Sequence, residues 1–252
     1  MGFNLAGKRA IVTGGGVGIG MGVVAEMCGE GMLVALTYLS HEPDQAFLDA
    51  CSAKSGQEVI ASRVDATDEQ QVIDYVARVN AEFGGIDILV NNVGGLVERV
   101  AIADMELDLW RKVQAINIDS MFLMTREVLK FMADGGRIIN VASLAGHNGG
   151  GNGSTAYAAS KSAVFGFTRG LAKEVAGRAI TVNALAPGLI LDTPFHETFT
   201  EPDAQRAAIQ SIALKRPGMP TDVAGPALWL ASEHASFVTG SVVDINGGQY
   251  FA

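Results

Sequence analysis

The chain has 252 residues, with 18 Lys and Arg against 27 Asp and Glu, so its formal net charge at pH 7 is −9. This acidic balance, without any cluster of basic residues, argues against a nucleic-acid partner. Hydrophobic residues make up 48% of the chain, enough for a large core, which excludes a disordered protein. No apolar run reaches the roughly 18 residues of a membrane span, so we expect neither a membrane segment nor a secretory signal.

Short runs rich in Val, Ile and Leu alternate along the chain with longer segments of helical periodicity. Near-continuous apolar runs are typical of strands that are covered on both faces. The predicted strands are Arg9–Thr13, Leu33–Tyr38, Glu58–Val64, Ile86–Asn91, Arg137–Ala142, Ile180–Ala186 and Ser241–Ile245. The clearest predicted helices are Asp68–Phe83, with Thr67 as N-cap, and the two long segments Leu107–Met132 and Tyr157–Ala176.

This alternation predicts an α/β fold in a single domain over residues 1–252. We expect a Rossmann-type, doubly wound parallel sheet of seven strands with helices on both faces. Ligands bind such a sheet at the carboxyl ends of its strands. The least regular stretch, residues 188–220, is predicted to be a loop-and-helix flap over the substrate.

The first candidate site is the sequence TGGGVGIG, which runs from Thr13 to Gly20 between the first strand and a helix. Glycines at such a junction let the backbone approach a pyrophosphate, and the helix N-terminus supplies N–H donors. The spacing is G-x-x-x-G-x-G rather than the standard G-x-G-x-x-G, so a plain turn is the alternative interpretation.

The second candidate site is the pair Tyr157 and Lys161, which lie one turn apart on a helix face. An ammonium beside a phenol is expected to lower the pKa of the tyrosine and make it an acid–base group near neutral pH. Ser143, at the end of the fifth strand, is placed to hold a substrate oxygen. The alternatives are a solvated helix face and a turn serine.

These sites belong to a longer ordered series, and with that series the whole chain resembles the short-chain dehydrogenase/reductase family. The resemblance implies an NAD(P)-dependent oxidoreductase that transfers a hydride between a nicotinamide and a carbonyl/alcohol substrate. The series consists of Thr13–Gly20, Asp65, Asn91–Gly94, Asn117, Ser143, Tyr157, Lys161 and Pro187–Gly188.

The resemblance also implies a role for each matching residue. Tyr157 would protonate the substrate oxygen, Lys161 would lower the pKa of Tyr157 and bind the nicotinamide ribose, and Ser143 would polarise the carbonyl. Asn117 would hold a water molecule that links Lys161 to solvent, and Asn91 would steady the central sheet. The implied cofactor contacts are Gly14, Val17, Gly18, Ile19, Tyr38, Asp65, Ala66, Asn91, Gly94, Tyr157, Lys161, Pro187, Gly188, Ile190 and Thr193.

Two departures from the family pattern lie near the substrate. Tyr157 follows Ser143 by 14 positions, one more than is usual in the family, and the extra length falls in the glycine-rich stretch His147–Gly153. The stretch that begins Pro187-Gly188 also has one residue more before Thr193, which makes Thr193 a less secure contact to the nicotinamide carboxamide.

The expected cofactor is NAD, with NADP left open. Tyr38 ends the second strand where dehydrogenases selective for NAD often carry an acid. A 2′-phosphate requires a cation, yet no Lys or Arg occurs between Arg9 and Lys54, and Glu42 would repel it. Ser40 and His41 remain possible phosphate donors.

The substrate is predicted to be a keto sugar acid of the uronate type, because several stretches around the expected mouth resemble bacterial reductases of such acids. Arg99 would pair with the carboxylate, and His147 and His196 are further candidate contacts. The rival substrate is a 3-oxoacyl thioester, which the apolar residues of the 188–220 flap would suit. A dehydratase or epimerase relative would need a longer chain, and a non-catalytic dinucleotide sensor or scaffold would not need the full catalytic set.

The remaining expectations concern assembly and location. Both long helices carry apolar residues on more than one face, which predicts a homotetramer, or at least a dimer. Cys28 and Cys51 have no metal-ligand spacing and the four histidines do not cluster, so we expect reduced buried thiols, a cytoplasmic protein and no metal site.

Overall fold

The structure is a computed structural model that describes residues 2–193 and 202–251. Within these residues one parallel sheet has seven strands in the order β3-β2-β1-β4-β5-β6-β7, which is the doubly wound arrangement. The strands are β1 (Arg9–Val12), β2 (Leu33–Tyr38), β3 (Ile60–Arg63), β4 (Ile86–Asn91), β5 (Met132–Val141), β6 (Thr181–Pro187) and β7 (Val242–Ile245). The predicted fold class and strand sequence are therefore confirmed.

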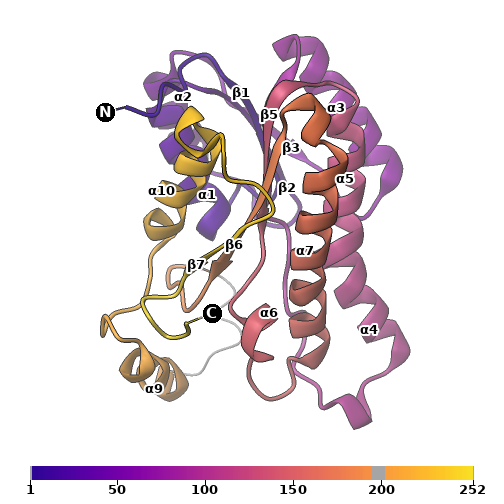
Figure 1. The fold of residues 1–252 in the computed structure, drawn as a ribbon, viewed down its shortest axis with the longest axis vertical. Coiled ribbons are helices and arrows are strands. Elements are labelled where there is room, and N and C mark those ends of the chain that lie inside the picture. The colour runs from indigo at the N-terminus through magenta and orange to yellow at the C-terminus, as the bar shows by residue number, and fades with distance from the viewer. Residues whose placement is uncertain (1, 194–201, 252) are drawn as a thin grey trace.

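Helices cover both faces of the sheet. In Figure 1 helices α1 (Gly18–Gly29), α2 (Gln45–Ser55) and α10 (Pro220–Ala231) lie on one side, and α3 (Glu69–Phe83), α5 (Ser120–Leu129) and α7 (Thr155–Glu174) lie on the other. The remaining helical segments are η1 (Ile102–Asp104), α4 (Leu107–Gln114), η2 (Ala115–Asp119), α6 (Ala145–Asn148), η3 (Ala176–Arg178), α9 (Pro202–Ser211) and η4 (Glu233–Ala235).

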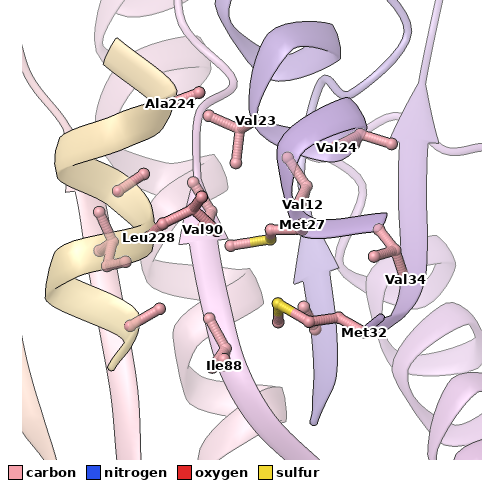
Figure 2. Close-up of a cluster of buried hydrophobic side chains, with 14 of the residues drawn as sticks. Val12, Val23, Val24, Met27, Met32, Val34, Ile88, Val90, Ala224 and Leu228 are labelled. Carbon is pink, nitrogen blue, oxygen red and sulfur yellow. The ribbon is translucent and has the colours of Figure 1, made fainter. Parts of the chain in front are cut away.

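The core on the α1 side forms because apolar side chains of α1 and α10 pack on the middle strands. Figure 2 shows Met27 of α1 lying among residues of β1 and β4, with Leu228 of α10 beside them. Each of these side chains is at most 4% exposed. A separate core on the opposite face joins α3, α5 and α7 to the sheet, so burial on both faces fixes the strand ends in place.

Two of the predicted helices need correction. The helix predicted over Leu107–Met132 ends at Leu129 and is divided by the π-helical segment η2, which contains Asn117. Met132 instead begins β5. The N-cap of α3 is Asp68 rather than Thr67, since its carboxylate accepts from the Gln70 N–H at 3.0 Å and the Gln71 N–H at 3.1 Å.

Residues 188–220, predicted as a substrate flap, contain helix α9 and a bridge between Ile190 and Gly218. In Figure 1, α9, α6 and the C-terminus lie at the same end of the sheet. None of the helices in the described part of the chain combines the length and apolarity that a membrane span requires.

Cys28 in α1 and Cys51 in α2 are free and buried, and they contact each other although they come from separate helices. Burial raises the pKa of the Cys28 thiol to about 12, with the neighbouring Cys51 adding to the effect. Because the thiolate is the reactive form, this environment keeps the thiol unreactive near neutral pH.

Candidate active site

A cavity of about 860 Å³ lies where the carboxyl ends of the strands meet. Its lining includes residues from the segments that follow all seven strands of the sheet, which is the position expected for the ligand of a doubly wound sheet. Of the fifteen predicted cofactor residues, fourteen line this cavity: Gly14, Val17, Gly18, Ile19, Tyr38, Asp65, Ala66, Gly94, Tyr157, Lys161, Pro187, Gly188, Ile190 and Thr193.

The glycine-rich loop after β1 needs glycine for conformation and for space. Gly14 and Gly18 have left-handed φ angles of 63° and 56°, and a Cβ on Gly20 would stand 2.2 Å from the Gly14 carbonyl oxygen. The N-cap of α1, Val17, offers no side-chain acceptor to the first helical N–H groups. The N–H groups at the start of α1 can donate to a bound anion, so the loop fits a dinucleotide pyrophosphate.

Asn92 belongs to the predicted Asn91–Gly94 stretch but had no predicted role, and the structure shows that it supports the glycine loop. Its side-chain amide donates to the carbonyl oxygens of Thr13 and Gly14, each at 3.0 Å. The Thr13 hydroxyl in turn accepts from the N–H groups of Asn92 and Val93. The position of Asn92 within the predicted Asn91–Gly94 motif was the available signal, but its partners become visible only in the fold.

The end of the cavity where the adenosine is predicted to bind is lined by residues after β2 and β3, with carboxylates nearby. The Tyr38 hydroxyl donates to Glu42 at 2.7 Å, and Asp65 accepts from the Thr67 hydroxyl at 2.6 Å. Arg63, which the sequence reasoning did not consider, is the neighbouring cation on β3, and its guanidinium donates to the Leu39 carbonyl at 3.1 Å.

Ser143, Tyr157 and Lys161 are brought together at the middle of the cavity. Tyr157 and Lys161 are 9% and 3% exposed, and the Tyr157 hydroxyl is hydrogen-bonded to Ser143. The Lys161 ammonium donates to the Val141 carbonyl at 2.9 Å and lies 5.8 Å from the centre of the Tyr157 ring. These three predicted catalytic residues thus lie together, with Tyr157 and Lys161 buried and Ser143 half-buried.

The predicted direction of the Tyr157 pKa is wrong for this structure. Burial raises the pKa of Tyr157, because the phenolate would be poorly solvated, and the hydrogen bond with Ser143 only partly opposes this. Burial also lowers the pKa of Lys161 to about 8. Tyr157 is therefore a protonated phenol at neutral pH, the form that a general acid needs.

Asn117 lies behind Lys161, in the π-helical segment between α4 and α5. Its amide nitrogen donates to the Gly95 carbonyl at 2.8 Å and to the Val113 carbonyl at 2.9 Å, and its oxygen accepts from the Gly95 N–H. A Cβ on Gly94 would stand 2.7 Å from both the Asn117 amide oxygen and the Lys161 nitrogen. Only glycine at position 94 leaves room for this arrangement.

Asn91 is the one predicted cofactor residue that does not line the cavity. Its amide nitrogen donates to Thr125 at 2.9 Å and to Asn140 at 2.9 Å, inside the sheet and its helix layer. The predicted role in steadying the central sheet agrees with these contacts, whereas the direct cofactor contact does not.

The predicted substrate residues do not all lie at the cavity. Arg99 lines the cavity, and its guanidinium donates to the Asn152 carbonyl at 3.0 Å. His147 does not line the cavity, because its ring packs between Phe165 and Tyr250 with Nε2 3.2 Å from Asp244. His196 lies outside the described residues.

Comparison with known proteins gives consistent matches over nearly the whole chain. A family model described as "Enoyl-(Acyl carrier protein) reductase" matches residues 15–249. The chain is 38% identical to Nodulation protein G of Azospirillum brasilense, covering 96% of this chain and 97% of that protein. It is also 38% identical to the 3-oxoacyl-[acyl-carrier-protein] reductase FabG of Thermotoga maritima, covering 98% and 99%.

Among solved structures, a short-chain dehydrogenase from Burkholderia cenocepacia in complex with NADP superposes with a TM-score of 0.90. The two chains are 32% identical, and the match covers 98% of this chain and 99% of the other. The fold of this chain therefore has a counterpart in a structure in complex with NADP.

Adding one methyl group at position 94 should disable the site. Gly94→Ala forces Lys161 or Asn117 to move, and a displacement of about 1 Å near reacting groups can cost on the order of 10²-fold in turnover. Gly95→Ala is the matched control, because a Cβ there meets no atom within 4 Å. Steady-state turnover of both variants measures the effect, and equal activity would show that the packing around Lys161 is not needed.

Burial of Lys161 should make stability depend on pH in the alkaline range. Between pH 8 and about 10.5 the unfolded lysine binds a proton that the folded one has released, so stability rises with pH by up to about 1.4 kcal/mol per pH unit. Below pH 8 both states are protonated and the full cost of burial remains.

Denaturant unfolding of the wild type and of Lys161→Met across pH 7–10.5 isolates this contribution. The free energy of unfolding of the wild type should increase relative to the variant as the pH rises above 8. A pH-independent difference would contradict a lowered pKa for Lys161.

Proposed function

The chain belongs to the short-chain dehydrogenase/reductase family and is an NAD(P)-dependent oxidoreductase, and on this premise we propose that it reduces 3-oxoacyl thioesters. The observation that carries the proposal is the buried group of Ser143, Tyr157 and Lys161 at the centre of a cavity that can hold a dinucleotide. The substrate class is supported by the relatives named as 3-oxoacyl-[acyl-carrier-protein] reductases.

A 3-oxoacyl thioester fits the findings better than the keto sugar acid predicted from sequence. None of the relatives described above is named as acting on a uronate. Arg99, the proposed partner of a sugar-acid carboxylate, is bonded to the Asn152 carbonyl, and His147 packs away from the cavity. The apolar side chains of Leu96, Leu144 and Leu189 line the cavity and suit an acyl chain.

In the proposed reaction the glycine-rich loop, Tyr38 and Asp65 would hold the dinucleotide, and Gly188, Ile190 and Thr193 would contact its nicotinamide part. The reduced nicotinamide, when bound, supplies the hydride that adds to the 3-oxo carbon. Ser143 donates a hydrogen bond to the carbonyl oxygen and orients it toward Tyr157. The Tyr157 hydroxyl transfers its proton to that oxygen, which completes a 3-hydroxyacyl thioester.

Lys161 acts in this scheme by placing a positive charge close to Tyr157. As the phenol gives up its proton, the nearby ammonium stabilises the developing phenolate in a site with little water. The side chains of Asn117 and Lys161 both lie behind Gly94. We propose that Asn117 holds a water molecule through which protons return from solvent to Lys161.

A two-substrate assay tests the proposed function. The purified protein with reduced nicotinamide should reduce an acetoacetyl thioester and show little or no activity on α-keto or aldehyde sugar acids. Activity confined to the sugar acids would refute the thioester proposal. Turnover of neither class, with cofactor bound, would favour the non-catalytic sensor.

The matched control for the assay is Tyr157→Phe, which keeps the ring and removes the acidic hydroxyl. Its turnover should fall by at least ~10²-fold, the usual scale of a general acid, while cofactor binding measured by nicotinamide fluorescence stays within a few fold of the wild type. Near-normal turnover by this variant would refute the role of Tyr157.

We further propose that NADH is preferred over NADPH. Glu42, bonded to Tyr38, and Asp65 place two carboxylates at this end of the cavity against the cation of Arg63, which is bonded to the Leu39 carbonyl, so the balance of charge opposes a 2′-phosphate. The kcat/KM for NADH should exceed the kcat/KM for NADPH, and Glu42→Ala should reduce the difference between the two values. Asp49→Ala, an exposed carboxylate on α2, is the control. A clear preference of the wild type for NADPH would contradict the proposal.

We also propose that the chain assembles as a homotetramer in the cytoplasm. Phe122 of α5 and Phe131 are 44% and 38% exposed, and Phe251 near the C-terminus is 83% exposed. Contact between these apolar rings and water is unfavourable, and a partner subunit would cover them. Tyr250, by contrast, packs on His147 within the same chain. Light scattering at micromolar concentration should give four times the chain mass of 26.3 kDa, and a monomer mass would exclude assembly.

A further inference from the structure

The turn after β7 has a conformation fixed by one buried side chain. The Asn246 amide oxygen accepts from the N–H groups of Gly248 at 2.9 Å, Gln249 at 3.1 Å and Tyr250 at 3.4 Å. Gly247 and Gly248 have left-handed φ angles of 63° and 79°, which other residues rarely adopt. The backbone at Gln249 is therefore held in one geometry.

Contacts with two other parts of the chain keep this turn in place. The Gly247 carbonyl accepts from the Leu214 N–H at 3.0 Å, just after α9. The Tyr250 ring stacks on His147 of α6, with 5.2 Å between ring centres and 19° between planes. Since α6 begins two residues after Ser143, the C-terminal turn and the catalytic segment are parts of one packed unit.

Gln249 is the residue of this turn that lines the cavity. Its amide oxygen would lie 3.2 Å from a Cβ placed on Gly188, and its amide nitrogen donates to the Ser211 hydroxyl at 3.3 Å, a long hydrogen bond. Gly188 follows Pro187, whose carbonyl accepts from the Leu144 N–H at 2.8 Å. Gln249 and Ser143 therefore border the same cavity and are linked through Gly188, Pro187 and Leu144.

We propose that the Gln249 amide binds the thioester carbonyl of the substrate while Ser143 and Tyr157 hold the 3-oxo group. The inference rests on the proposed function and adds a specificity-determining residue to it. The two carbonyls of a 3-oxoacyl thioester are separated by one methylene, so both must be held at neighbouring points of one cavity. An amide NH₂ has two donor hydrogens, and among the described residues Ser211 is the partner of only one.

The chemistry of an amide favours this ligand over an acid. A neutral donor suits a neutral carbonyl, whereas a carboxylate is held best by a bidentate arginine. Lys161 and Arg99, the two cations of the described cavity lining, each donate to a backbone carbonyl, that of Val141 and that of Asn152. The Gln249 amide is therefore assigned to the neutral thioester carbonyl.

Two variants of similar size test the role of Gln249. Gln249→Glu and Gln249→Met remove the donor hydrogens, and each should raise the KM for an acetoacetyl thioester by up to about 10-fold, the loss of one hydrogen bond. The kcat should stay within about threefold, because the contact is the same in the ground state and the transition state. The NADH dissociation constant and the melting temperature should not change.

Ser211→Ala is the matched control, since it removes the recorded partner of the Gln249 amide and leaves the amide itself; its KM should stay within about twofold of the wild type. An unchanged KM in both Gln249 variants would refute the inference alone. A KM that changes together with NADH binding and melting temperature would show a structural role and refute it as well. Failure of the wild type to reduce the thioester would refute the proposed function, and the inference with it.

Discussion

The burial of the Lys161 ammonium is the constraint on which the rest of the site depends. An ammonium that loses its hydration is costly unless every remaining donor finds a partner, and here the Val141 carbonyl supplies one at 2.9 Å. The space around it is closed by Gly94, which has no side chain, and by the amide of Asn117. These contacts do not fully compensate for the lost hydration of the ammonium, because burial lowers the pKa of Lys161 to about 8.

A lysine in such a site must be held by rigid elements, and buried hydrogen bonds through the sheet provide them. Asn91 of β4 donates to Thr125 of α5 and to Asn140 of β5, and Asn140 donates to Thr168 of α7. The chain of bonds joins the helix after Asn117 to the helix that carries Tyr157 and Lys161. In a dry interior these bonds are strong, and they resist any relative sliding of α5 and α7.

The sequence alone was sufficient for features whose signal is local. Strands β2 and β4 were predicted to the residue because their apolar runs end at polar turn residues, and the glycine loop because its pattern follows a strand directly. Features that depend on tertiary contacts were not predictable. The contacts of Asn117 include Gly95, 22 positions earlier in the chain, and the raised pKa of Tyr157 comes from burial that the i, i+4 spacing with Lys161 does not reveal.

The same distinction explains why the reaction is easier to infer than the substrate. The cofactor end of the cavity is built at strand ends, where residues adjacent in sequence line the site together. The substrate end is built from turns that are distant in sequence, and Gln249 reaches it only because Asn246 shapes one turn and the stacking of Tyr250 on His147 attaches that turn to α6. A change in one of these turns can alter the substrate without disturbing Tyr157 or Lys161, so relatives with the same chemistry need not share a substrate.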